Sequence, residues 1–125
     1  MYKILIIEDD LVVQNVTREL VEILGYNVIT AASAGEAFEL IDNSEETIHL
    51  VILDMSLPDA SGVDIIPDIK KKLPDSLIVV CTGATVTDDD SEVISSWGIK
   101  DILQKPFEFK IMRDTLQALL PIDNS

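Results

Sequence analysis

The stretch Ile4-Leu5-Ile6-Ile7-Glu8-Asp9-Asp10 places three acids directly after four apolar residues. Three further apolar runs also end on a polar residue: residues 50–53 at Asp54, residues 77–81 at Thr82, and residues 102–104 at Lys105. Runs without polar alternation are typical of parallel strands that are buried on both faces. The carboxyl ends of parallel strands share one edge of a sheet, where α/β proteins bind ligands. We therefore expect carboxylates, a hydroxyl and an ammonium group at one edge, a set suited to a divalent cation and a phosphoryl group.

Helical patterns alternate with these runs along the chain. Gly25 ends a first predicted helix, residues 33–36 have the form of a capping box that opens a second, and Thr87 caps a fourth. Residues 26–31 form a further predicted strand. This alternation predicts five βα units in one doubly wound α/β domain over residues 1–125, with no output domain. The apolar residues at helical spacing in the first and last predicted helices are Val13, Val16, Leu20, Ile23, Leu24, Ile111, Leu116, Leu119 and Leu120.

Pro67 disagrees with a regular third helix. If that helix begins at Gly62, Pro67 lies too far along it for a first-turn position and removes a backbone hydrogen bond. A start at Asp64 keeps Pro67 in the first turn. The sequence therefore favours the later start, or a bend at Pro67.

Composition narrows the class of partner. The 125 residues carry a formal net charge of -14, and a surface so acidic repels nucleic-acid backbones and anionic membranes. The single cysteine, Cys81, lies within an apolar run and is expected to be a buried, reduced thiol. The first apolar stretch is too short to cross a membrane and lacks the basic flank of a signal peptide. We expect a cytoplasmic domain that binds neither nucleic acid nor membrane directly.

Four motifs together resemble the receiver domain of bacterial two-component response regulators. They are residues 4–10, residues 51–58 with Gly62, residues 80–84, and Lys105-Pro106-Phe107. Each motif alone is weak, but their order, with one at each strand end, is specific. The resemblance covers essentially the whole chain and implies a flavodoxin-like, five-stranded parallel sheet in the order 2-1-3-4-5 with five helices. In that order Asp9 and Asp54 meet where the strand order reverses.

The resemblance also implies a magnesium-dependent phosphorylation site. Asp54 is the expected phosphoacceptor, which attacks a phosphohistidine and forms an acyl phosphate. Asp9 is expected to bind Mg²⁺ directly and Glu8 directly or through water. Asp54 and the backbone carbonyl of Met55 complete the protein ligands. Ligation by oxygen alone suits Mg²⁺ rather than zinc.

Other residues are expected to support this chemistry. Lys105 neutralises a phosphoryl oxygen, and Thr82 donates a hydrogen bond to another. Gly83 keeps the approach open, and the peptide bond before Pro106 is usually cis in this family. Asp10 is expected either beside the metal ligands or as a helix cap.

The implied function is a signalling switch. A sensor histidine kinase or a histidine phosphotransfer protein supplies the phosphoryl group, and a downstream effector domain or protein responds to the phosphorylated form. Because Asp54 is consumed in each cycle, we do not expect a turnover enzyme. Output is expected through the face formed by the fourth helix, fifth strand and last helix. Many receivers carry Tyr or Phe at the position of Ile102, so the usual aromatic switch beside Thr82 is in doubt here.

Two other classes share parts of the pattern. The run Thr82-Gly83-Ala84-Thr85 resembles the phosphate loop of a flavin-binding flavodoxin, but that loop should follow the first strand. A phosphatase of the haloacid dehalogenase type needs a second Asp two residues after the nucleophile, where this chain has Ser56. A colourless protein that hydrolyses no generic phosphomonoester would dismiss both alternatives.

The lifetime of the phosphorylated form can be predicted from two positions. In receivers, the residues two beyond the phosphoacceptor and two beyond the threonine help to place the hydrolytic water. Ser56 and Ala84 occupy them here and offer neither carboxylate nor amide. We therefore expect slow autodephosphorylation. Mass spectrometry of the phosphorylated protein over time measures the rate at which the phosphoryl group is lost. Rapid loss that Ser56→Asn and Ala84→Glu barely accelerate would contradict this expectation.

Overall fold

The computed structural model describes residues 1–83, 85–106 and 108–122, and it contains the five predicted βα units. Strands and helices alternate along the chain without interruption. The elements are β1 (Lys3–Ile7), α1 (Leu11–Ile23), β2 (Asn27–Ala31), α2 (Ala34–Asn43), β3 (Leu50–Asp54), α3 (Gly62–Lys72), β4 (Leu77–Thr82), α4 (Asp88–Ser96), β5 (Ile102–Gln104) and α5 (Phe109–Leu119).

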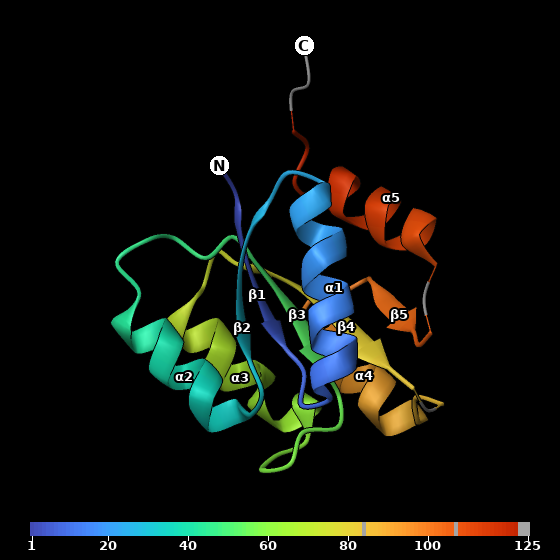
Figure 1. The fold of residues 1–125 in the computed structure, drawn as a ribbon. Helices are drawn as coiled ribbons and strands as arrows, with labels where there is room; N and C mark the ends of the chain where they lie inside the picture. Colours follow the sequence, from blue (N-terminus) through green and yellow to red (C-terminus); the bar gives the residue numbers. More distant parts are fainter. Residues whose placement is uncertain (84, 107, 123–125) are drawn as a thin grey trace.

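The five strands form one parallel sheet in the order β2-β1-β3-β4-β5, as predicted. Helices α1 and α5 cover one face of the sheet, and α2, α3 and α4 cover the other (Figure 1). The strand order reverses between β1 and β3, whose register pairs Ile7 with Leu53. The residues that follow β1 therefore lie beside Asp54, the last residue of β3.

The central strands contribute alternate residues to two separate cores. In β1, Leu5 and Ile7 face α2 and α3, whereas Ile4 and Ile6 face α1 and α5. All four side chains are at most 1% exposed. Burial on both faces explains why these strands are apolar throughout. The cores hold the strand register, and with it the positions of the polar residues at the strand ends.

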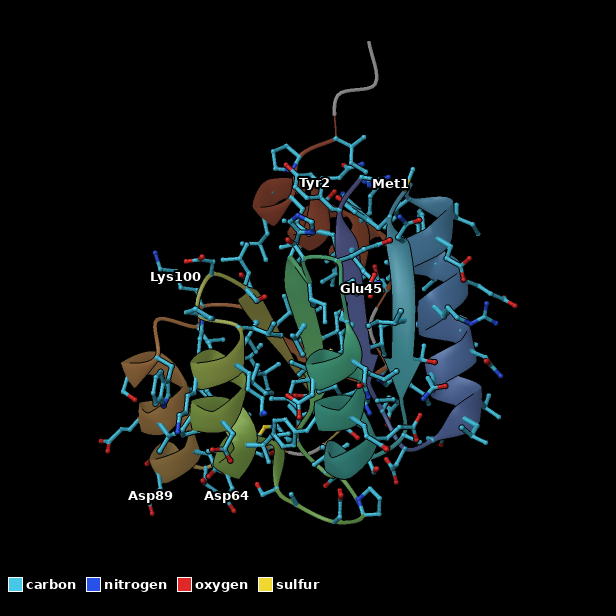
Figure 2. The ribbon with its side chains drawn as sticks, turned by 90° about the vertical axis from the view of Figure 1, so that its left-hand side faces the viewer. Met1, Tyr2, Glu45, Asp64, Asp89 and Lys100 are labelled. Atoms are coloured by element: carbon cyan, nitrogen blue, oxygen red, sulfur yellow. The ribbon has the colours of Figure 1, made fainter. Side chains whose placement is uncertain are left out.

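Functional residues and helix starts gather at the same end of the sheet. Figure 2 labels Asp64 and Asp89, in the first turns of α3 and α4, at one end of the molecule, and Met1 and Tyr2 at the opposite end. Three predicted N-caps are confirmed, because the side chains of Asp10, Ser33 and Thr87 each accept a hydrogen bond from a backbone N–H of the helix that follows. The positive helix N-termini thus face the edge that carries the acids.

The structure departs from the sequence patterns in two details. Helix α3 begins at Gly62, so the predicted start at Asp64 is wrong and Pro67 lies inside the helix, whereas the alternative of a bend at Pro67 stays a prediction. In α1, Val16 and Ile23 are exposed, whereas Gln14 and Thr17 are buried. The polar pair is tolerated because both side chains donate hydrogen bonds to backbone carbonyls, at 2.8–3.2 Å. Ile111 of α5 is likewise exposed, and Met112 is buried in its place.

Gly62 supports a specific prediction about stability. A Cβ atom there would lie 2.5 Å from the Asp54 carbonyl oxygen and 2.8 Å from the Met55 Cα, so the backbone around Asp54 would have to move. We expect Gly62→Ala to lower the free energy of unfolding in urea by about 1–3 kcal/mol. Gly83→Ala is the matched control, because a Cβ there meets nothing within 4 Å. Equal losses in the two variants would contradict the role of the close approach.

Candidate functional site

Three carboxylates meet at the carboxyl end of the sheet, as predicted. Glu8 and Asp9 follow β1 directly, and Asp54 ends β3. Each residue offers one oxygen, and these three oxygens all lie within 4.8 Å of one another. Glu8 and Asp54 are buried, whereas Asp9 is exposed and opens the cluster to solvent. A cluster of oxygen ligands with an open side fits a hydrated divalent cation.

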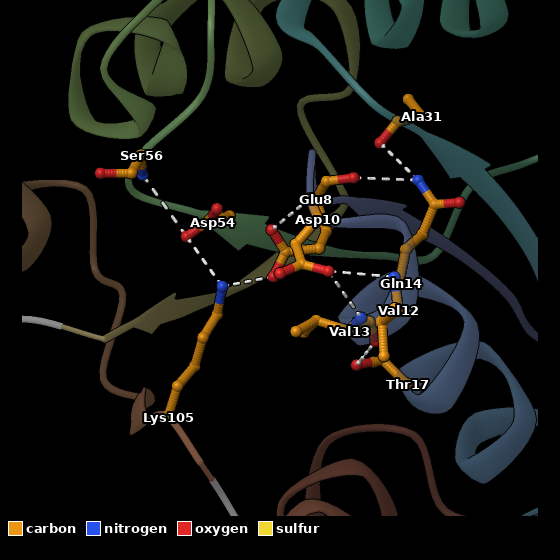
Figure 3. Close-up of polar contacts among 10 residues, drawn as sticks. All are labelled: Glu8, Asp10, Val12, Val13, Gln14, Thr17, Ala31, Asp54, Ser56 and Lys105. Atoms are coloured by element: carbon orange, nitrogen blue, oxygen red, sulfur yellow. Dashed lines mark hydrogen bonds and ion pairs between the residues drawn. The ribbon is translucent and has the colours of Figure 1, made fainter.

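Lys105 brings a positive charge to this cluster. Its Nζ lies 3.2 Å from Asp54 Oδ1 and also forms an ion pair with Glu8 (Figure 3). Its backbone N–H donates to the Thr82 carbonyl at 2.7 Å, and the peptide bond to Pro106 is cis, as expected. Lys105 is therefore held at the end of β4 while its side chain reaches the acids from β1 and β3.

The charges in this cluster are not fully balanced by Lys105. Burial raises the pKa of Glu8 to about 7; the hydrogen bond to Lys105 opposes this shift, and the neighbouring Asp54 adds to it. Burial alone would lower the pKa of Lys105, but its hydrogen bond to Glu8 and the charge of Asp54 raise it. Burial also raises the pKa of the nearby Cys81 thiol to about 12, so this free cysteine is unreactive. The site retains excess negative charge that a cation would neutralise.

The start of α1 is tied to the strand ends by two polar residues. Asp10 Oδ1 accepts the N–H groups of Val12 and Val13, so Asp10 acts as the helix cap. Gln14 Nε2 donates to the Glu8 carbonyl at 2.9 Å and the Ala31 carbonyl at 3.2 Å (Figure 3). Gln14 thereby joins the ends of β1 and β2. We did not predict this role from the sequence, where Gln14 interrupts an apolar pattern without a distinguishing motif.

The loop between β3 and α3 turns back on itself beside Asp54. Ser56 and Ser61 form an antiparallel bridge, in which Gly62 N–H donates to the Met55 carbonyl at 2.8 Å. In such a bridge the backbone groups of the central residue point away from its partner. The Ser56 N–H accordingly donates to Asp54 Oδ1, at 3.4 Å. The Met55 carbonyl thus faces Gly62, whereas the Ser56 N–H is directed to the phosphoacceptor candidate.

The same loop carries an acid whose role the sequence did not reveal. Asp59 accepts the N–H of Ala34 on Oδ1 and the N–H of Gly35 on Oδ2, both at 2.9 Å. These bonds lower the pKa of Asp59, and the bond from Gly35 has the larger effect. In the sequence Asp59 follows Pro58 and looks like an ordinary turn residue. Its partners lie 24 and 25 positions away, a separation that no local pattern predicts.

Some of the remaining predicted site residues lie within the described part of the chain, and others lie outside it. Thr82 is buried at the end of β4, and Gly83 is exposed directly after it. Ile102 opens β5 with 37% of its surface exposed. Ala84 and Phe107 lie outside the described residues. The described residues thus include Thr82, Lys105 and the three acids Glu8, Asp9 and Asp54.

Comparison with known proteins matches this geometry to one family. Residues 4–117 match the response regulator receiver domain. The chain belongs to the response regulator receiver family. Receivers of this family are phosphoacceptor signalling domains and generally not turnover enzymes. The flavodoxin and phosphatase alternatives are therefore set aside.

Relatives of this receiver include both longer regulators and solved receiver structures. The transcriptional regulatory protein CitT of Halalkalibacterium halodurans is 32% identical over 120 residues, covering 94% of this chain and 52% of CitT. A structure of the response regulator TrrA from Thermotoga maritima, in complex with Mg²⁺ and BeF, is 28% identical with a TM-score of 0.80, covering 96% of this chain and all of that one. A response regulator from Burkholderia pseudomallei, with a phosphorylated aspartic acid, a calcium ion and citrate, is 26% identical with a TM-score of 0.80, covering 95% and 66% of the two chains.

The receiver spans about half the length of the transcriptional regulators that it matches. Within residues 1–83, 85–106 and 108–122, no helix has the length and apolar character needed to cross a membrane.

The raised pKa of the buried Glu8 predicts a pH dependence in the absence of divalent cations. Unfolded Glu8 loses its proton near pH 4.5 but folded Glu8 only near 7, so its contribution to the free energy of unfolding falls as the pH rises between these values. We expect the stability of wild type relative to Glu8→Gln to fall by about 1–2 kcal/mol over this window, less than full linkage because the site is partly open to water. Urea unfolding with a chelator present measures the difference.

Glu39→Gln, at an exposed position of α2, controls for the change in net charge. A stability difference between wild type and Glu8→Gln that is constant or rises with pH would contradict the raised pKa of Glu8.

Proposed function

We propose that Asp54 accepts a phosphoryl group from a phosphohistidine, and that the transfer depends on Mg²⁺. The ion pairs of Lys105 with both Glu8 and Asp54 carry this proposal, because they hold an ammonium group where negative charge must be neutralised. A carboxylate that attacks an anionic phosphoryl group is otherwise repelled by it. The structures of TrrA with Mg²⁺ and BeF and of the Burkholderia regulator with phosphoaspartate support the same chemistry in relatives.

The donor set of the site fits magnesium. Glu8, Asp9 and Asp54 offer carboxylate oxygens within 4.8 Å of one another, and the exposure of Asp9 leaves room for water ligands. We propose the carbonyl of Ser56 as the backbone ligand in place of the Met55 carbonyl, which is directed toward Gly62. When bound, Mg²⁺ would neutralise negative charge on the acids and on the transferring phosphoryl group.

The reaction exchanges one bond to phosphorus for another. An Asp54 oxygen forms the new O–P bond while the N–P bond to the donor imidazole breaks, and the nitrogen leaves with the electron pair. Lys105 neutralises an oxygen of the transferring group, and Thr82 donates its hydroxyl hydrogen to another. The bond from Lys105 N–H to the Thr82 carbonyl keeps these two residues together during the transfer.

The donor histidine needs a surface beside Asp54 on which to dock. An apolar groove of about 310 Å³ lies between α1 and the turn after β5, lined by Val12, Val16, Leu20 and Pro106 among others. Val12 is 73% exposed and Val16 is 53% exposed. We propose that a histidine-bearing helix of a sensor kinase or phosphotransfer protein packs here, since exposed apolar patches of this kind mark protein interfaces.

Output is proposed through a different face, formed by α4, β5 and α5. Exposed apolar residues occur on each of these elements: Val93 and Trp97 at α4, Ile102 on β5, and Ile111 on α5. Because they are partly exposed in this structure, a partner that covers them would gain hydrophobic stabilisation. The effector is a further domain or a separate protein, as the transcriptional regulators among the relatives suggest.

Intact-mass spectrometry after incubation with acetyl phosphate tests the proposed function. We expect a single phosphoryl adduct that requires Mg²⁺ and disappears in Asp54→Ala. Asp68→Ala, at an exposed position on α3, is the control and should accept the group like wild type. Absence of the adduct on folded wild-type protein would show that the domain works by docking without phosphorylation.

A further inference from the structure

Asp59 connects the loop that follows Asp54 to a helix distant in sequence. Each of its two carboxylate oxygens accepts one N–H from the first turn of α2, at 2.9 Å from Ala34 N and 2.9 Å from Gly35 N. Ser33 Oγ separately accepts the Glu36 N–H at 3.1 Å. Two independent side chains therefore cap the N-terminus of α2: the N-cap residue Ser33, and Asp59 from the loop between β3 and α3.

The contact is well suited to hold the loop in place. Asp59 lies between Ser56 and Ser61, which form the bridge, and within the turn that the bond from Leu57 N–H to the Ala60 carbonyl closes at 3.2 Å. A carboxylate at the positive end of a helix is favourable, and the bonds from α2 lower the pKa of Asp59 accordingly. Both carboxylate oxygens accept a hydrogen bond, so the contact sets the orientation of the loop relative to α2 as well as its distance from α2.

The loop has other supports, which determine what the loss of Asp59 should do. Met55, Leu57 and Ala60 pack against the core shared by α2 and α3. Without the Asp59 carboxylate the loop should therefore stay folded, but it should lose its hydrogen bonds to α2. Because Ser56 lies only three residues before Asp59, a small displacement of the loop moves the Ser56 backbone relative to Asp54 Oδ1.

We propose that Asp59 is a positioning residue for the phosphorylation site: by anchoring the loop to α2, it places the Ser56 backbone against Asp54 and so increases the affinity for Mg²⁺ and the rate of phosphoryl transfer. The part that concerns transfer rests on the proposed role of Asp54. Groups that directly orient metal ligands change metal affinity by about 10–100-fold when removed. Asp59 acts through the intervening loop, so its removal should weaken Mg²⁺ binding by about 3- to 10-fold.

Asp59→Ala and Ser33→Ala form a matched pair for the test. Each removes one side-chain cap from the first turn of α2, but only Asp59→Ala releases the loop. The dissociation constant for Mg²⁺ is measured by NMR titration, and the phosphorylation rate with acetyl phosphate by intact mass. We expect weaker Mg²⁺ binding and slower phosphorylation in Asp59→Ala, values within twofold of wild type in Ser33→Ala, and intermediate values in Asp59→Asn, which keeps one acceptor oxygen.

Amide hydrogen exchange provides a readout that needs neither Mg²⁺ nor phosphate. Asp59→Ala should speed exchange of the Leu57 and Gly62 N–H groups, whose bonds close the loop, and Ser33→Ala should not. Unchanged Mg²⁺ affinity in Asp59→Ala, or an equal loss in Ser33→Ala, would overturn the proposal. If wild type accepts no phosphoryl group but Asp59→Ala still weakens Mg²⁺ binding, the positioning role stands and the phosphoacceptor role of Asp54 fails.

Discussion

Electrostatic repulsion among carboxylates at the end of a hydrophobic sheet is the constraint on which the rest of the structure depends. Glu8 and Asp54 are buried, and their oxygens lie within 4.8 Å of each other and of Asp9. Buried like charges are unfavourable unless a counter-charge is fixed beside them. Lys105 supplies one ammonium group for several acids, and the pKa of Glu8 stays near 7 despite it. The incomplete neutralisation makes the site receptive to a divalent cation.

The fold keeps these charges together although they repel. Two cores enclose the sheet, and the register of the strands sets Asp54 opposite Cys81 and Ile7 opposite Leu53. At the edge itself, Gln14 joins the ends of β1 and β2, and the Lys105 N–H joins the end of β5 to that of β4. Hydrophobic burial therefore offsets the destabilising effect of the clustered charges. Proteins commonly compensate in this way for functional groups that lower the stability of the fold.

The sheet and the charged site were predictable from sequence because both follow from local patterns. Apolar runs locate buried parallel strands, and the residue after each run then lies at the ligand-binding edge. Glu8, Asp9, Asp54 and Lys105 were identified in this way and do lie together. The phosphorylation chemistry itself came from the resemblance of these motifs to receiver domains, and the residue roles remain proposals.

The features that sequence reasoning missed have a common physical origin. Helical spacing in α1 favoured Val16 and Ile23 as buried residues, yet Gln14 and Thr17 are buried because backbone carbonyls satisfy their polar groups. Asp59 contacts a helix 24 residues earlier in the chain. Hydrogen bonds between distant segments leave no periodic signal, so neither contact could be derived from residue spacing.

Two hydrogen-bonded connections lead from the site toward the helices, and they suggest how a change at Asp54 reaches the surface without an aromatic residue at position 102. One runs through Lys105 and the Thr82 carbonyl to β4 and β5. If Asp54 accepts a phosphoryl group as proposed, the added negative charge would compete with Glu8 for Lys105, a residue that follows β5 directly. Ile102 begins that short strand and is partly exposed, so a shift of β5 would change the apolar surface on the proposed output face. The second connection runs through the loop and Asp59 to α2, on the opposite face of the sheet from α5. One loop thus contacts Asp54 through the Ser56 N–H and caps α2 through Asp59.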